Sequence, residues 1–219
     1  MGKIFVIMGK TSSGKDTVFK YLLDNLSVSQ GIQKGLKTVV SYTTRPMRPG
    51  ETDGVEYFFV PEGRLLELRE QGKVLEERCY HTVHGPWYYF TVLDGQIDLS
   101  SHDYVMINTL VGFEKLRAYY NVDRVIPLYI DADPKERLLR YIHRESKQEK
   151  PNYAEVCRRF LADEDDFSEG KLERLGVKKR YVNQELEKCC QEIAEDIGIF
   201  LDREAEELGS RQGEPSQVM

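Results

Sequence analysis

The sequence predicts a three-layer α/β fold with a parallel core sheet, on the strength of three observations. Continuous apolar runs at 3–8, 104–108 and 125–131 read as buried strands and alternate with segments of helical periodicity. A glycine-rich turn at 9–17 joins the first run to the first helix. Residues 43–93 are rich in aromatics and turns, which predicts a small, mostly antiparallel lobe inserted into the α/β core.

The elements follow in chain order. After the strand at 3–8, the spacing of apolar residues predicts a helix at 15–26, and a second strand follows at 36–42. The inserted lobe contributes short strands at 55–60, 74–78 and 87–92 and a brief helix at 62–71. The second half contains strands at 104–108, 125–131 and 178–183 and helices near 113–120, 134–149, 153–167 and 184–208.

Composition excludes several classes of function. With 37 acidic and 31 basic residues, the net charge of −6 disfavours nonspecific nucleic-acid binding. No apolar run approaches the roughly 20 residues that span a bilayer, and no secretory signal is evident. The four cysteines (Cys79, Cys157, Cys189 and Cys190) lack metal-binding spacing. We expect a cytoplasmic protein with reduced thiols and no nucleic-acid or membrane partner, and the oligomeric state stays open.

The turn at 9–17 has the features of a phosphate-binding loop. Gly9 and Gly14 let backbone N–H groups approach phosphate oxygens, and Lys15 at the helix start can bridge the β- and γ-phosphates. Asp16 stands where a magnesium-binding hydroxyl is usual, so Thr17 or Asp16 is the expected contact to Mg²⁺. A chance Gly/Ser turn is the alternative, and the strand before and helix after disfavour it. The residues expected to bind ATP are Gly9, Lys10, Thr11, Ser12, Ser13, Gly14, Lys15, Asp16, Thr17 and Arg140.

A second motif lies at 41–59 and can hold another anion. Two guanidiniums, from Arg45 and Arg48, give charge-assisted bonds to phosphate, and hydroxyl groups complete the shell. The pattern Ser41-x-Thr43-Thr44-Arg45-x-x-Arg48-x-Gly50-Glu51-x-x-Gly54-x-x-Tyr57-x-Phe59 closely resembles the signature of guanylate kinases. The resemblance covers the chain to about residue 205. It implies a P-loop kinase fold and a nucleoside-monophosphate acceptor.

The resemblance also assigns roles to individual residues. It implies that the substrate-binding set is Ser41, Arg45, Arg48, Glu51, Tyr57, Glu76, His84 and Thr109, with Glu76 reading the guanine edge. Two positions depart from the family. Pro86 stands where a hydroxyl would donate to the base, and Thr109 where an aspartate would read the base amino group. The residues expected to bind the acceptor phosphate are therefore present in the sequence, whereas two of those expected to recognise the base are replaced.

A lid completes the expected site. Arg140, Arg144 and Arg159 match positions where the family supplies arginines to the triphosphate, although helix-surface charge is the alternative for each. The expected catalytic residues are Lys15, Arg45, Arg144 and Arg159. Asp131 and Asp133 are expected to cap the next helix. The implied division is a core (1–35, 94–137, 169–208), an acceptor-binding lobe (36–93), a helical lid (138–168) and a disordered tail (209–219).

The leading hypothesis is ATP- and Mg²⁺-dependent phosphorylation of GMP or dGMP. The same chemistry on another nucleoside monophosphate, or on ribose 1,5-bisphosphate, stays open because of Pro86 and Thr109. A non-catalytic, peptide-binding module is less favoured because Lys15 is present and no accompanying interaction domain is seen.

Overall fold

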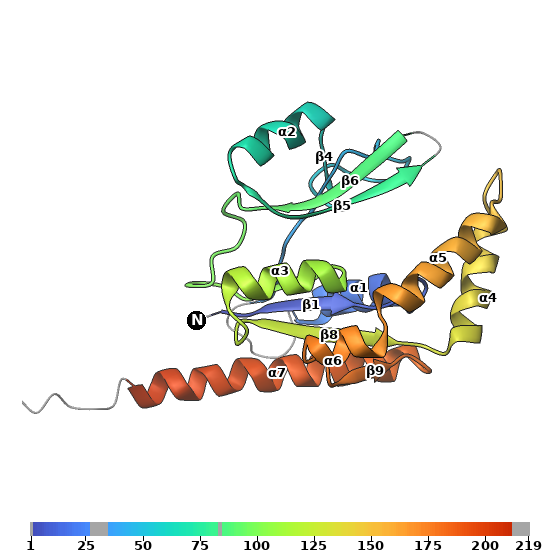
Figure 1. Ribbon diagram of the computed structural model, residues 1–219. Helices are drawn as coiled ribbons and strands as arrows, with labels where there is room; N and C mark the ends of the chain where they lie inside the picture. The colour runs from blue at the N-terminus through green and yellow to red at the C-terminus, as the bar shows by residue number, and fades with distance from the viewer. Residues whose placement is uncertain (1, 27–34, 83–84, 212–219) are drawn as a thin grey trace, which may run out of the picture.

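A computed structural model describes residues 2–26, 35–82 and 85–211, with side chains up to residue 201. The larger of its two sheets is parallel and has the strand order β2-β7-β1-β8-β9 (Figure 1). Its strands are β1 (Ile4–Met8), β2 (Lys37–Thr38), β7 (Tyr104–Ile107), β8 (Val125–Asp131) and β9 (Arg180–Val182). The register Ile4↔Tyr104 and Ile4↔Val125 puts β1 at the centre, where every residue is buried.

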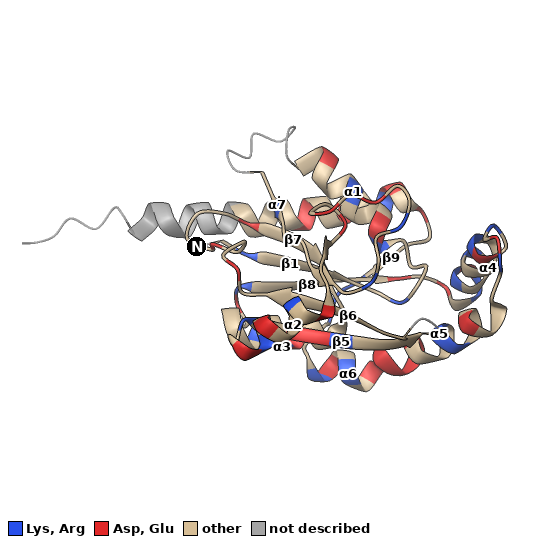
Figure 2. Ribbon diagram, turned by 90° about the horizontal axis from the view of Figure 1, so that it is seen from above, with Lys and Arg blue, Asp and Glu red and all other residues tan. Residues whose placement is uncertain are grey.

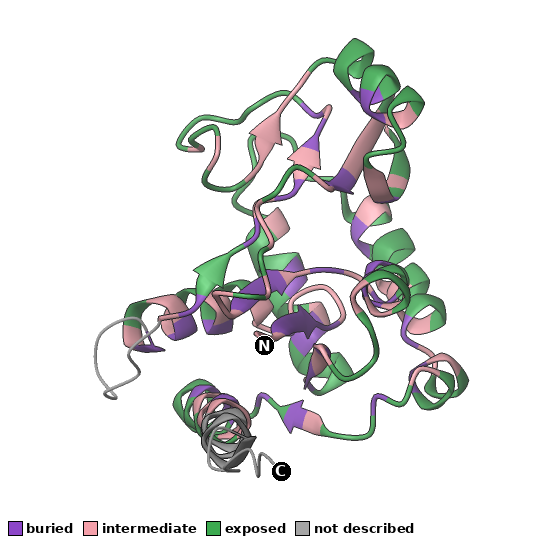
Figure 3. Ribbon diagram, turned by 90° about the vertical axis from the view of Figure 1, so that its left-hand side faces the viewer, coloured by how far each residue is buried: buried purple, intermediate pink, exposed green. Residues whose placement is uncertain are grey.

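Alternate residues of β1 build two separate cores. Ile4, Val6 and Met8 pack with helix α3 (Leu110–Tyr120) and helix α6 (Glu169–Arg174) on one face. Phe5 and Ile7 pack with helices α1 (Lys15–Leu26) and α7 (Leu186–Arg211) on the other. These helix layers enclose the buried strands seen in Figure 2 and Figure 3. A strand buried on both faces explains why its sequence is a continuous apolar run.

A smaller sheet stands apart from the large one (Figure 1). Its strand order is β4-β3-β6-β5, and all its pairs are antiparallel except β3 with β4. The strands are β3 (Tyr42–Thr43), β4 (Phe58–Phe59), β5 (Val74–Thr82) and β6 (Gly85–Val92). Helix α2 (Glu62–Glu70) covers its outer face through a small core of Leu65, Leu68, Phe90 and Val92.

Two further helices project beyond the carboxyl end of β8 (Figure 1). Helix α4 (Pro134–Glu145) begins at Asp133, whose carboxylate accepts hydrogen bonds from the next two free N–H groups, as expected. Helix α5 (Tyr153–Asp166) is capped in the same way by Asn152. Both helices belong to the predicted lid.

The predicted α/β class, the parallel core sheet and the inserted lobe are confirmed, and several details differ. The single strand expected at 36–42 is divided: β2 joins the large sheet and β3 the small one. The amide side chain of Gln96 bonds both backbone groups of Val40 between them, so this segment needs no strand partner. The lobe therefore begins after β2 and not at residue 36. Strand β5 runs four residues past its expected end, and α6 is additional.

Helix α7 extends to Arg211, into the segment expected to be disordered, and residues 212–219 lie outside the described residues. None of the described helices combines the length and apolarity needed to cross a membrane.

Candidate active site

A hydrogen bond from Asn183 stabilises the conformation of the loop between β1 and α1. The amide of Asn183, which is 4% exposed, donates to the carbonyl oxygen of Ser13 at 2.8 Å. Gly14 has φ +97°, and a Cβ there would lie 2.2 Å from the Asn183 amide nitrogen. Ser12 also adopts a positive φ of 62°. The loop is thus held in a strained backbone conformation of the kind that forms anion-binding turns.

An open cavity of about 430 Å³ lies over this loop. Its lining consists of Ser12, Gly14, Asp16, Thr17, Arg140, Arg144, Asn183, Gln184 and Leu186. The structure therefore brings five predicted ATP-binding residues and the predicted catalytic Arg144 to one space. Asp16 and Thr17 are exposed and offer hard oxygen atoms, a donor set that suits Mg²⁺ held jointly with phosphate oxygens. No cluster of three potential metal ligands occurs within the described residues, so phosphate would have to complete such a site.

Lys15 sits at the start of α1 with its charge only partly compensated. Burial lowers the pKa of Lys15, and the coulombic effects of Asp16 and Asp163 oppose that change. The guanidiniums of Arg144 and Arg137 lower the pKa further. A desolvated ammonium group beside other cations is stabilised by an added anion, which is what a triphosphate supplies.

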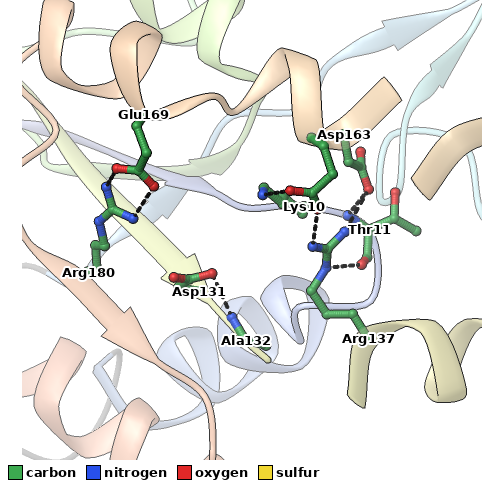
Figure 4. Close-up of polar contacts among 9 residues, drawn as sticks. Lys10, Thr11, Asp131, Ala132, Arg137, Asp163, Glu169 and Arg180 are labelled. Atoms are coloured by element: carbon green, nitrogen blue, oxygen red, sulfur yellow. Dashed lines mark hydrogen bonds and ion pairs between the residues drawn. The ribbon is translucent and has the colours of Figure 1, made fainter. Parts of the chain in front are cut away.

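A buried ionic network, which the sequence did not predict, connects the loop to the lid helices (Figure 4). Arg137 of α4, which is 1% exposed, donates to the carbonyl of Thr11 at 3.1 Å and to Glu164 at 2.9 Å. Asp163 of α5 lies 3.4 Å from Arg137 and accepts the N–H of Thr11 at 2.6 Å. Glu164 also accepts from the Lys10 ammonium at 2.5 Å. Lys10 and Thr11, predicted as ATP ligands, are thus engaged with the lid in this structure.

The lid arginines lie in different surroundings. Arg140 and Arg144 line the cavity, and the Arg144 guanidinium is 4.7 Å from the ring centroid of Tyr141. Arg159 pairs instead with Glu155 on its own helix at 2.9 Å and is 47% exposed. Its predicted catalytic role would need the exposed guanidinium to turn toward the cavity.

The second motif forms a preorganised cation in the small sheet. Arg45 is 3% exposed and makes two parallel bonds, of 2.8 and 2.9 Å, to the carboxylate of Glu51. These bonds hold the pKa of Glu51 below its usual value. The backbone N–H of Arg48 also donates to Glu51, at 2.7 Å, while the Arg48 side chain is exposed. Glu51 therefore orients Arg45. Ser41 is buried, and its carbonyl accepts the N–H of Phe58.

The register of the hairpin β5–β6 differs from the one that the sequence pattern indicated, so different residues lie near Arg45. Arg78 pairs with Tyr89 and Glu76 with Thr91, whereas Pro86 pairs with His81 near the tip. Pro86 lies five residues along β6 from Thr91, the partner of Glu76, which is a distance of about 17 Å. The expectation that Pro86 faces the base is therefore wrong, because β5 is longer than its sequence pattern indicated. His84, the predicted phosphate ligand in the same loop, lies outside the described residues.

Tyr89 lies close to Tyr57 and Arg45. Its ring lies 5.4 Å from that of Tyr57, centroid to centroid, and the Arg45 guanidinium is 5.7 Å from the Tyr57 ring. Burial raises the pKa of Tyr57, with a further contribution from Tyr89. Counting the strand register back from the hairpin turn was the signal that could have identified Tyr89.

Glu76 is buried at the junction of the two sheets, 4% exposed. Its Oε1 accepts from the Thr91 hydroxyl at 2.8 Å and from the Asn108 amide at 3.2 Å. Its Oε2 is buried and, among the described residues, accepts no hydrogen bond. Asn108, which follows β7, thus helps to hold the Glu76 carboxylate in place. The Thr109 hydroxyl instead caps α3, accepting the N–H of Gly112 at 3.3 Å.

The two halves of the site share one edge of the molecule. The phosphate loop follows the carboxyl end of β1, and Asn108 follows the carboxyl end of the adjacent β7. Crevices at this edge of open parallel sheets are the usual ligand sites of such folds. The small sheet supplies Glu76 from β5, and Arg45 and Tyr57 lie in the loops next to β3 and β4.

Comparison with known proteins agrees with this arrangement. Residues 1–92 match the family model described as guanylate kinase. The guanylate kinase of Methylobacillus flagellatus is 40% identical over 87 residues, which are 40% of this chain and 38% of that protein. That of Legionella pneumophila is 32% identical over 142 residues, 63% of each chain. This chain thus aligns with less than two thirds of the length of either relative.

A crystal structure of guanylate kinase from Anaplasma phagocytophilum superposes with a TM-score of 0.55. It is 22% identical and covers 93% of this chain and 86% of the other. At this identity the similarity establishes the fold.

Proposed function

We propose that this chain transfers the γ-phosphoryl group of ATP to a nucleoside 5′-monophosphate, with GMP or dGMP preferred. The proposal starts from the match of its first 92 residues to the guanylate kinase family. The alignment covers only part of each curated relative, so the activity rests on the site geometry as well as on kinship. The observation that carries the proposal is the buried Oε2 of Glu76, which accepts no hydrogen bond from the described residues.

The donor half would bind the triphosphate in the cavity over the phosphate loop. Backbone N–H groups of the loop and the positive end of α1 would face the phosphates, and Lys15 would neutralise charge between the β- and γ-positions. Bound Mg²⁺ would neutralise phosphate charge, with Asp16 and Thr17 available near it. Arg140 and Arg144 would stabilise the charge that spreads over the migrating group.

The acceptor half would hold a phosphate and a base at separate points. Arg45, Arg48 and the hydroxyls of Tyr57 and Tyr89 suit a phosphate dianion. The Oε2 of Glu76 is an acceptor fixed by its partners Thr91 and Asn108, and it complements adjacent N–H donors of a guanine edge. Since the protein contributes no covalent intermediate in such transfers, rate enhancement would come from positioning and charge.

A steady-state assay tests the proposal with ATP, Mg²⁺ and a panel of acceptors: GMP, dGMP, AMP, UMP and ribose 1,5-bisphosphate. We expect GMP and dGMP to be phosphorylated at rates typical of kinases, about 1–100 per second. Lys15→Ala should abolish turnover. Glu76→Gln should lower kcat/KM for GMP about 10- to 100-fold, because an amide opposes the base donors.

Two outcomes would contradict the proposal. Turnover at background with every nucleoside monophosphate would indicate a binding module, and preference for the sugar phosphate would indicate a different acceptor class. Thermal stabilisation by ATP that persists unchanged in Lys15→Ala would contradict the donor site.

A further inference from the structure

The inner and outer faces of strand β5 carry different charged residues. Glu77 points to the outer face, where it pairs with Arg69 of α2 at 2.8 Å. Because side chains alternate along a strand, Glu76 and Arg78 share the opposite face, which the Glu76–Asn108 bond turns toward the large sheet. Arg78 thus faces the acceptor crevice, directly across from Tyr89.

Two buried polar atoms form an ion pair on this inner face without a well-aligned hydrogen bond. The Arg78 Nε lies 3.3 Å from the Glu76 Oε2, and within the described part of the chain neither atom makes a hydrogen bond of good geometry. The Glu76 side chain is 1% exposed and that of Arg78 is 21% exposed. The two opposite charges compensate each other, but a buried donor and a buried acceptor without well-aligned hydrogen bonds are costly unless a ligand satisfies them.

Their chemistry specifies the ligand edge. An acceptor beside a donor complements an N–H group beside a carbonyl, which is the N1–H and O6 edge of a 6-oxopurine. We propose that Arg78 determines specificity by donating a hydrogen bond to the O6 atom of the acceptor base while Glu76 accepts from N1–H. This inference rests on the proposed function. It supplies the base donor that the sequence lacks at Pro86, which lies too far along the hairpin to serve.

Recognition of phosphate by Arg78 is the competing role, since Arg78 lies near Tyr57, where its charge opposes the rise in the pKa of Tyr57 that burial causes. The base is favoured because Nε lies next to the carboxylate oxygen that has no other partner. The two roles differ in what they predict for a substrate changed at a single base atom.

The test compares GMP with 6-thioguanosine 5′-monophosphate, in which sulfur, a weak acceptor, replaces O6. In Arg78→Met, kcat/KM for GMP should fall about 10- to 100-fold, the range for a hydrogen bond from a charged donor. The fall for the thio substrate should be smaller, so the preference for GMP should shrink about 5- to 10-fold. Both substrates are measured on one preparation, so any inactive fraction cancels from the ratio.

Two further variants sharpen the result. Arg78→Lys retains a cation with one flexible donor and should restore part of the preference for GMP. Arg69→Met is the matched control, because it removes an arginine from the outer side of the same hairpin and should leave the ratio unchanged. If Arg78→Met lowers kcat/KM equally for both substrates, Arg78 binds phosphate or only supports the fold, and the inference is wrong. If wild-type protein uses no nucleoside monophosphate, the proposed function itself fails first.

Discussion

Replacing Arg137 by methionine tests whether the lid helices hold the phosphate loop. The change keeps most of the buried volume but removes the guanidinium that contacts Thr11, Asp163 and Glu164. Breaking a buried ion pair costs about 3–5 kcal/mol. We expect the lower limit, because Glu164 keeps Lys10 as a partner and is 41% exposed to water. A free-energy loss of about 3 kcal/mol corresponds to a fall in Tm of about 6–12 °C for a domain of this size.

The assay is thermal denaturation by circular dichroism, paired with steady-state kinetics. Loosening the loop should raise KM for ATP more than KM for the acceptor, since Arg137 contacts only the donor side among the described residues. Arg158→Met is the control: its pair with Glu155 is 57% and 39% exposed and should contribute no more than about 1 kcal/mol. If the two variants lower Tm equally, or if Arg137→Met raises both KM values together, the reasoning is refuted.

Three other predictions concern the loop, the lid and the thiols. Gly14→Ala should destabilise the protein by about 2–3 kcal/mol and abolish ATP binding in a titration, because a Cβ at φ +97° is strained and displaces the Asn183 amide. The arginine partners of Glu155 lower its pKa from 4.5 to about 2, so its stabilisation is present above pH 4.5 and is lost as the pH falls toward 2. Acid denaturation of Glu155→Gln should therefore show a slightly weaker pH dependence in that interval, with a small effect because the pair is exposed. A thiol reagent should label Cys79 and Cys157 rapidly in native protein and all four cysteines only after denaturation, since the other two are buried.

The inner strands of the large sheet could be predicted from the sequence because β1, β7 and β8 are mostly buried and each is a continuous apolar run. Strand β1, helix α1 and strand β8 have the expected positions. The division at Val40 could not be predicted, since it depends on Gln96, 56 residues away, which bonds the backbone there. Local pattern carries no information on such a pairing.

The candidate site divides in the same way. The phosphate loop and Arg45 belong to contiguous motifs, and the structure forms a cavity over the first and buries the second in a bidentate pair with Glu51. Arg78 and Tyr89 were missed because their roles depend on strand register, which is fixed by where the hairpin turns. Arg137 was missed for another reason. An arginine in a charged helix resembles surface charge until tertiary packing covers it, and here 1% of it remains exposed.

The bond between Glu76 and Asn108 joins a residue of the small sheet to one at the edge of the large sheet. The carboxylate that would recognise the base is therefore also part of the joint between the two bodies. A rotation of the small sheet that lengthens this bond would loosen the carboxylate whose Oε2 is the proposed acceptor for the base. By thermodynamic linkage, a ligand that binds more tightly to one orientation of the small sheet shifts the equilibrium toward that orientation by the same factor. Substitutions at Asn108 would then change substrate discrimination and interdomain angle together, although this side chain need never touch the substrate.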